Sequence, residues 1–358
     1  MREILSEGFV ASAVSRGELA LAARAGATSQ RTVLEGIGKS ESDLGAAAAL
    51  SARGTPLLWV SLETAEDAEA LAARARRKKV TVDVLVRLNP SVVPETHRGL
   101  AVGAAASKFG VLPEELPAVI ESGGGPNGPL RWRGIHLHVG SQLGAVDAWR
   151  SAFRVGLRLL ELQRAELPDF DTLDAGGGFP VAMSAGQSVP QPVHFAAAAH
   201  AELDALKPAS RPARLAVEPG RAVVAGCGWL VGRVLHVRQR DPAIVVLDAG
   251  MTELIRPALY GAEHPMLALT SLGRPTDDTT MESTSVRVDG PICESTDTLG
   301  RDDLPPLARG DLVAIGVAGA YGSSMASTYN GRPRSAEIAW DDRRLTLLRR
   351  RGSLASLP

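Results

Sequence analysis

Short apolar runs alternate with longer segments rich in Ala, Leu, Glu and Arg over the first two-thirds of the chain. The runs show little polar alternation, which is typical of strands buried on both faces of a parallel sheet. The segments between them, such as Thr64–Arg77 and Trp149–Leu167, predict helices. The apolar runs predict seven strands: Phe9–Val14, Thr32–Glu35, Leu57–Val60, Thr81–Leu88, Gly134–Val139, Thr172–Asp174 and Arg214–Val217.

This alternation over roughly 220 residues indicates a parallel sheet, either doubly wound or closed as a (β/α)8 TIM barrel. We favour the barrel because polar motifs bearing Gly, His and Ser follow the strand ends. A barrel has eight strands, whereas seven are predicted. Residues 1–8 read as the end of a helix with no strand or cap before it, so we expect the first barrel strand to be missing.

The pattern changes after Arg221, where strands are separated by turn-rich segments without long helices. This texture predicts an all-β domain. We therefore expect an α/β barrel domain at 1–221, a β-domain at 222–350 and a frayed tail at 351–358. The strands predicted in the β-domain are Trp229–Arg238, Ala243–Leu247, Ser283–Val288, Leu312–Val317 and Ala336–Trp340.

Composition narrows the class of protein. The 358 residues carry a formal net charge of −1, with arginines spread among acidic residues, which argues against a nucleic-acid or anionic-membrane surface. No apolar stretch is long enough to span a membrane, and no signal-peptide pattern begins the chain. Cys227 and Cys293 are too few for a disulfide scaffold, and Cys227 is expected to be structural. We expect a cytoplasmic enzyme.

Two glycine-containing loops follow predicted strands. Gly176–Gly178 comes directly after Thr172–Asp174, where glycines permit a tight turn whose amides can face an anion such as phosphate. Glu218-Pro-Gly-Arg221 closes the last strand of the first domain, and its cation could complete a phosphate site or bind a carboxylate. A plain βα turn is the alternative for the three glycines.

Histidines, tyrosines and a cysteine supply further candidates. His136 and His138 lie on one face of a strand, but no third ligand is evident, so we predict no metal site. The three tyrosines all lie in polar, Gly-rich strings, where a hydroxyl can reach a ligand; turn packing is equally compatible with Tyr321. Cys293 and Glu294 are adjacent, which suits a proton donor beside an ammonium-binding group, or alternatively a buried structural thiol.

Eight collinear strings together resemble the fold-type III pyridoxal-phosphate decarboxylases, and among them the diaminopimelate decarboxylases. The resemblance covers nearly the whole chain and implies an alanine racemase-like barrel followed by a β-domain. The strings are Ser15–Leu19, Ser107–Gly110, His136–Gln142, Gly176–Gly178, Glu218–Arg221, Asp248–Tyr260, Cys293–Asp297 and Gly319–Asn330.

The resemblance implies pyridoxal 5'-phosphate as cofactor and decarboxylation of meso-2,6-diaminopimelate to L-lysine and CO2, the last step of lysine biosynthesis. It also implies a homodimer with shared active sites. By resemblance, Cys293 is the proton donor. The cofactor-binding residues are His138, Ser141, Gly177, Glu218, Gly220, Arg221 and Tyr329. The substrate-binding residues are Arg221, Arg256, Tyr260, Glu294 and Tyr329.

One departure from the family is the absence of its Schiff-base lysine, which lies in a Tyr-Ala-x-Lys-Ala-Asn-like string after the first barrel strand. Lys39 lies at a strand-to-helix junction and is the least unsuitable of the five lysines, but we expect it not to substitute. Either the intact protein begins earlier and is a working decarboxylase, or this chain is a non-catalytic homologue or partner subunit. A paralogous decarboxylase of another basic amino acid is a further alternative.

Overall fold

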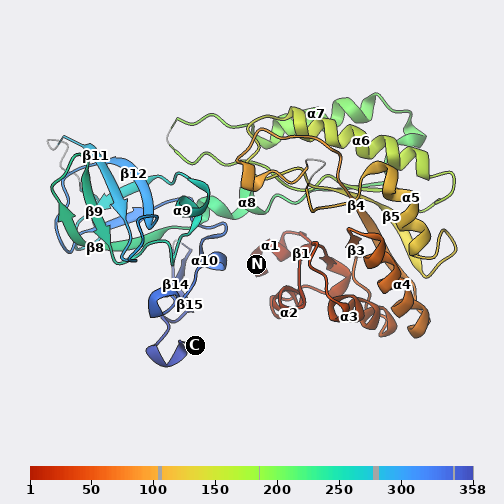
Figure 1. Ribbon diagram of the computed structural model, residues 1–358, viewed down its shortest axis with the longest axis horizontal. Coiled ribbons are helices and arrows are strands. Elements are labelled where there is room, and N and C mark those ends of the chain that lie inside the picture. The colour runs from red at the N-terminus through yellow and green to blue at the C-terminus, as the bar shows by residue number, and fades with distance from the viewer. Residues whose placement is uncertain (104–106, 185, 277–281, 342, 358) are drawn as a thin grey trace. The chain divides into compact units, whose positions relative to one another are not determined.

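The computed structural model describes residues 1–103, 107–184, 186–276, 282–341 and 343–357. The chain forms two compact units. Residues 1–180 and 190–219 make up the first, here called the barrel unit, and residues 181–189 and 220–358 make up the second, the β unit. Each unit is described by itself (Figure 1).

The barrel unit contains a seven-stranded sheet in which the strands lie in chain order and every neighbouring pair is parallel. All seven predicted strands are present. They are β1 Ala11–Ala13, β2 Thr32–Leu34, β3 Trp59–Leu62, β4 Val82–Leu88, β5 Leu130–Leu137, β6 Thr172–Asp174 and β7 Arg214–Ala216.

The sheet is curled into a TIM-like half-barrel. In a flat sheet, β2 and β7 would lie about 24 Å apart, because they are separated by five inter-strand spacings of ~4.8 Å. Yet donor atoms of Glu35, which follows β2, and Glu218, which follows β7, lie within 4.8 Å of each other. Curvature therefore brings the ends of the sheet together and confirms the predicted barrel-like architecture.

Helices connect the strands and cover the sheet. The helix that precedes β1 matches the helical reading of residues 1–8. The α-helices of the barrel unit are α1 Arg2–Ser6, α2 Arg16–Arg24, α3 Glu41–Ala52, α4 Ala65–Lys78, α5 Leu116–Ser122, α6 Asp147–Gln163 and α7 Pro192–Asp204. Short 3-10 turns are η1 Ser29–Arg31, η2 Arg98–Leu100, η3 Pro113–Glu115 and η4 Pro208–Ser210.

Helix α4 shows why these segments are helical. The Thr64 hydroxyl accepts a hydrogen bond from the Asp67 amide at 3.0 Å and caps the first turn. Basic residues occupy the last turn, where they complement the helix dipole. The residues that α4 buries follow the i, i+3, i+4, i+7 spacing of one helical face: Ala68, Leu71, Ala72 and Ala75.

The β unit contains a six-stranded sheet in the order β10-β13-β8-β9-β11-β12, in which only β9 and β11 pair in parallel. One face buries an apolar core that includes Val234, Leu247 and Val313. A separate hairpin joins β14 and β15. The strands are β8 Leu230–Arg238, β9 Ala243–Leu247, β10 Met266–Leu269, β11 Thr284–Asp289, β12 Thr298–Leu304, β13 Leu312–Ile315, β14 Glu337–Trp340 and β15 Leu345–Arg349.

The all-β reading of this part is confirmed, although three strands were not predicted: β10, β12 and β15. In the described part of this unit, the strands are interrupted by short helical turns. They are α8 Gly220–Val224, η5 Ala225–Cys227, α9 Arg256–Tyr260, α10 Gly322–Met325, η6 Tyr329–Gly331 and η7 Leu354–Ser356. No described helix is long and apolar enough to cross a membrane.

Candidate active site

Polar side chains gather where the barrel strands end. Glu35 follows β2, His136 lies near the end of β5, Asp174 ends β6 and Glu218 follows β7. Carboxyl ends of parallel strands meet at one edge of a sheet, so residues far apart in sequence converge there. Glu35, His136 and Asp174 are each at most 5% exposed, whereas Glu218 is half-buried. A buried ionisable cluster of this kind is typical of a functional site.

The two histidines are held as neutral rings on either side of Glu218. Their ring nitrogens, His136 Nε2 and His138 Nδ1, each lie 3.8 Å from Glu218 Oε2. The Gly177 amide donates to His138 Nδ1 at 3.1 Å, so this nitrogen is an acceptor and the ring proton lies on Nε2. Burial lowers the pKa of His136 to about 4 and also lowers the pKa of His138. Neither ring is charged at neutral pH.

The carboxyl groups differ in their protonation. Burial, reinforced by the charges of Glu35 and Asp174, raises the pKa of Glu218 well above its ordinary value. Burial and the Glu35 charge raise the pKa of Asp174 to about 7. Burial acts in the same direction on Glu35, but His136 and hydrogen bonds from Glu218 and Ser12 outweigh it and leave its pKa lowered. The cluster therefore carries negative charge on Glu35 and stores a proton on Glu218.

Three buried atoms of this cluster have no hydrogen-bond partner among the described residues: Glu35 Oε1, His136 Nε2 and Glu218 Oε1. Unpaired buried polar atoms are costly, so they point to a group that binds there. The same three residues place donor atoms within 4.8 Å of one another, a spacing that could also hold a metal ion. From the sequence, the His136–His138 pair and the Cys293–Asp297 loop had been considered for a metal, and no metal site was predicted.

The three glycines form a turn that other residues could not adopt. Gly176 and Gly178 have φ of 67° and 100°, in the left-handed region, and a Cβ on Gly177 would lie 2.5 Å from the Glu218 carbonyl oxygen. The Gly176 amide donates to Asp174 Oδ1 at 2.9 Å. The turn thus brings the β6 end against His138 and the backbone of Glu218. Ser141 lies just beyond β5, and its amide donates to the Leu100 carbonyl at 3.1 Å.

The lysines do not supply an amine to this cluster. Lys39 is buried, pairs with Asp67 at 3.1 Å and donates to the Gly36 carbonyl. Lys108 is exposed and lies over the Phe109 ring. Lys78 and Lys79 end helix α4, and Lys207 precedes η4. Lys39 is paired with Asp67, although its charge also contributes to lowering the pKa of His136; that it does not substitute for the Schiff-base lysine stays a prediction.

The β unit contains a cationic cluster. Arg221 and Arg256 are 6% and 3% exposed, and their guanidinium carbons lie 4.9 Å and 5.5 Å from the centre of the Tyr321 ring. Arg256 also lies 5.2 Å from the Tyr260 ring. Burial and the neighbouring Arg256 lower the pKa of Arg221 to about 10, and burial lowers that of Arg256. Arg256 Nε has no hydrogen-bond partner among the described residues, so this buried guanidinium can still bind an anion.

Tyr321 is a member that the sequence left undecided. Its ring contacts both guanidiniums, and its φ of 63° is uncommon for a residue with a side chain. A strained backbone at a polar cluster is a frequent mark of a functional site. Its place in a polar, Gly-rich string was the available signal.

A second group lies on loops of the β unit. Tyr329 Oη donates to Glu294 Oε1 at 2.6 Å, and Asn330 Nδ2 donates to Cys293 Sγ at 3.3 Å. All four residues are exposed, so Cys293 is not a buried structural thiol. Cys227 is exposed as well, which contradicts its predicted structural role; it lies in the solvent-facing turn η5 rather than in the core.

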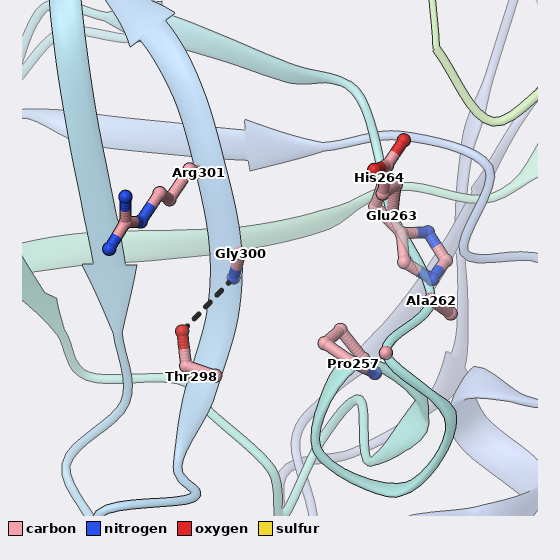
Figure 2. Close-up of a pocket in the computed structure, with 8 residues that line it drawn as sticks. Pro257, Ala262, Glu263, His264, Thr298, Gly300 and Arg301 are labelled. Carbon is pink, nitrogen blue, oxygen red and sulfur yellow. Dashed lines mark hydrogen bonds between the residues drawn. The ribbon is translucent and has the colours of Figure 1, made fainter.

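A pocket of about 310 Å³ adjoins helix α9 (Figure 2). His264 Nδ1 donates to the Gly316 carbonyl at 2.9 Å, which leaves Nε2 buried and without a hydrogen-bond partner among the described residues. None of the residues predicted for the site lines this pocket. The lining residues are Pro257, Gly261, Ala262, Glu263, His264, Thr298, Gly300 and Arg301.

Comparison with known proteins identifies the family. Residues 2–225 match the family model described as the pyridoxal binding domain of pyridoxal-dependent decarboxylases. A diaminopimelate decarboxylase of Deinococcus radiodurans is 36% identical over 98% of this chain and 83% of that protein. One of Aquifex aeolicus is 32% identical over 96% of this chain and 78% of that protein.

The fold agrees with this relationship. The crystal structure of a mutant diaminopimelate decarboxylase of Helicobacter pylori, complexed with L-lysine, matches with a TM-score of 0.87 and 30% identity. The match covers 99% of this chain and 84% of that one. The barrel-like sheet and the separate β unit agree with this match. The chain therefore belongs to the pyridoxal-dependent decarboxylases.

Proposed function

We propose that the protein decarboxylates meso-2,6-diaminopimelate to L-lysine and CO2 with pyridoxal 5'-phosphate as cofactor. The observation that carries this proposal is the Glu218 carboxyl group: its Oε2 lies 3.8 Å from both neutral histidines, and its buried Oε1 has no hydrogen-bond partner among the described residues. This group matches the needs of a pyridine nitrogen that must stay protonated. The names of the relatives supply the substrate.

The barrel unit fits the cofactor. Glu218 would accept a hydrogen bond from the ring N–H, and the negative Glu35 beside it would favour the positive charge. His138, held by the Gly177 amide, would offer the flat face of its ring. Bound there, pyridoxal phosphate supplies an electron sink for the bond to the departing carboxylate. Ser141, Gly177, Gly220, Arg221 and Tyr329 are the residues that we assign to its phosphate.

The β unit supplies groups for the far end of the substrate. Arg221 and Arg256 are planar cations that can pair with a carboxylate, and Tyr260 and Tyr321 lie against them. Glu294 offers a carboxylate to an ammonium group. When the bond between the α-carbon and CO2 breaks, its electron pair stays on the α-carbon. Cys293 Sγ then gives its proton to that carbon and regains one from solvent.

The direct test incubates the purified chain with pyridoxal phosphate and meso-2,6-diaminopimelate and measures CO2 and L-lysine. Equal amounts of both products are expected, and their absence at every cofactor concentration would contradict the proposal. Parallel reactions with ornithine and lysine address the paralogue alternative. Release of CO2 from these alone would identify a decarboxylase of another basic amino acid.

A second candidate, a non-catalytic cofactor-binding protein, is favoured by one observation. None of the five lysines, all of which lie in the described part of the chain, makes a hydrogen bond or ion pair with the strand-end cluster of Glu35, His136, Asp174 and Glu218, and Lys39 is engaged with Asp67. Borohydride reduction followed by peptide mapping tests this. A cofactor covalently fixed to Lys39 or Lys108 after reduction would argue for catalysis. Cofactor binding without a reducible bond, together with no CO2, would establish the binding protein.

We also propose that the protein acts as a homodimer in cytoplasmic lysine biosynthesis. The exposed Cys293 and Glu294 are available to a second chain, which supports the shared site implied by the family resemblance. Sedimentation equilibrium tests the assembly: a mass twice that of the chain is expected at micromolar concentration. A monomer at all concentrations would contradict a shared site.

A further inference from the structure

One short segment of the β unit connects three groups of candidate site residues. Residues 248–254, here called the connecting segment, lead directly into helix α9, which carries Arg256 and Tyr260. The Ser327 amide donates a hydrogen bond to the Thr252 carbonyl at 2.9 Å, which links the connecting segment to the residues just before Tyr329. The third link, to the loop that carries Cys293 and Glu294, is made by Asp297.

The carboxylate of Asp297 bridges the two segments through the backbone. Its Oδ1 accepts a hydrogen bond from the Met251 amide, and its Oδ2 accepts one from the Ile292 amide, both at 2.6 Å. Ile292 immediately precedes Cys293. Bonds from amides to a carboxylate are shorter and stronger than those between neutral groups. One side chain thus holds the connecting segment and the Cys293 loop together.

The backbone around Asp297 is shaped to admit this carboxylate. A Cβ on Gly250 would lie 2.5 Å from Oδ1, and a Cβ on Gly290 would lie 2.3 Å from the Asp297 oxygens. Asp297 itself is 3% exposed, and its backbone closes the loop through the Gly290 amide at 2.9 Å and the Glu294 carbonyl at 3.1 Å. Two glycines and two amides therefore surround a buried carboxylate, and the amide bonds, together with the Arg332 charge, offset part of the cost of its burial.

We propose that Asp297 is a positioning residue that sets the placement of the Cys293 thiol relative to the Arg256–Tyr260 helix. This inference rests on the proposed function, because the donor role of Cys293 comes from there. Asp297 touches neither thiol nor substrate-binding group, and it acts through the amides of Met251 and Ile292. Without it, the loop would lose its link to the connecting segment, and the thiol would lose its fixed place beside Asn330.

The test measures the alkylation rate of Cys293 by iodoacetamide in a Cys227→Ser background, since both thiols are exposed. Asp297→Ala is expected to raise the rate about fivefold. Asp297→Asn keeps one acceptor oxygen and is expected to raise it about twofold. The control is Val313→Ala, which creates a cavity in the core of the same unit. The variants are compared at equal fractions of folded protein, and Val313→Ala should leave the alkylation rate unchanged.

Turnover gives the second readout. Asp297→Ala should lower kcat for diaminopimelate about 20-fold and change KM less than threefold, with partial rescue in Asp297→Asn. Equal alkylation rates in Asp297→Ala and Val313→Ala would overturn the proposal, and if Asp297→Ala does not fold, Asp297→Asn against wild type decides in the same way. Alkylation needs no turnover, so an inactive wild type would count against the proposed function while leaving the positioning role open to test.

Discussion

The strand-end cluster of the barrel unit and the loop groups of the β unit differ in burial and in how they are held in place. His136 and Asp174 are buried on strands, and Glu35 is buried directly after one, so the backbone ladder fixes the register of all three. Cys293, Glu294 and Tyr329 are exposed and lie on loops that are held by hydrogen bonds from side chains. Burial shifts pKa values strongly in the first region, whereas the second retains accessible groups that can meet a substrate. Under the proposed function, the buried residues at the strand ends set the protonation of the bound cofactor, and the exposed loop residues recognise the substrate.

The largest expected effect comes from replacing the carboxyl group at the centre of the buried region, whose raised pKa leaves it a proton that it can share with the pyridine nitrogen. Glu218→Gln cannot hold the pyridine ring protonated, so kcat should fall about 1,000-fold, as for loss of a buried charge-assisted bond at a reacting group. Turnover is measured as CO2 release. Glu202→Gln, which makes the same change in a buried carboxylate that pairs with Arg150 and Arg154 outside the cluster, is the matched control; its kcat per folded protein should stay near wild type. Similar losses in both variants would remove the special role of the cluster.

The cationic group of the β unit should control recognition rather than chemistry. Arg256→Gln keeps much of the side chain but loses the planar cation, so KM for meso-2,6-diaminopimelate should rise about 100-fold with kcat much less changed. Steady-state kinetics measures both constants. Arg287→Gln, in the half-exposed pair with Asp289, is the control and should alter neither. A fall confined to kcat would place Arg256 with the buried region instead and break the comparison.

The dependence of stability on pH tests the protonation assigned to the buried region. Asp174 has its pKa raised from 3.8 to about 7 by burial and by Glu35, so the folded state holds a proton that the unfolded chain releases. Its contribution is therefore intact below pH 4 and is lost progressively as pH rises to about 7. Asp174→Asn should be more stable than wild type by roughly 2 to 4 kcal/mol at pH 8 and nearly equal at pH 4.

Chemical denaturation at several pH values measures this difference. His136, whose lowered pKa of about 4 makes acid destabilising between pH 6.5 and 4, is present in both proteins, so its effect cancels in the difference. A stability difference between Asp174→Asn and wild type that does not grow with pH would contradict the assigned protonation.

The success of the sequence predictions also differs between the buried strands of the barrel unit and the more exposed β unit. Strands buried on both faces are continuous apolar runs, so all seven strands of the barrel unit were predicted. Strand β12 has the sequence Thr-Leu-Gly-Arg-Asp-Asp-Leu and β15 is largely exposed, so neither carries a buried-strand pattern. Cys293 and Glu294 are neighbours in the chain and were found together. Glu35 was missed because its nearness to Glu218 arises only from the curvature of the sheet between β2 and β7.

The smallest expected effect tests whether exposed groups matter to recognition without mattering to the fold. Tyr329→Phe removes the hydroxyl that donates to Glu294 at 2.6 Å, while the ring remains. Because both residues are exposed, thermal unfolding should be unchanged, but Glu294 loses the partner that orients it toward an ammonium, so KM should rise about threefold. Tyr260→Phe serves for comparison: it also removes a hydroxyl and keeps the ring beside Arg256, and its KM is measured separately. A lower unfolding temperature with an unchanged KM would show that the Tyr329 bond stabilises the fold. The loop region would then have a structural role, as the buried strand ends do.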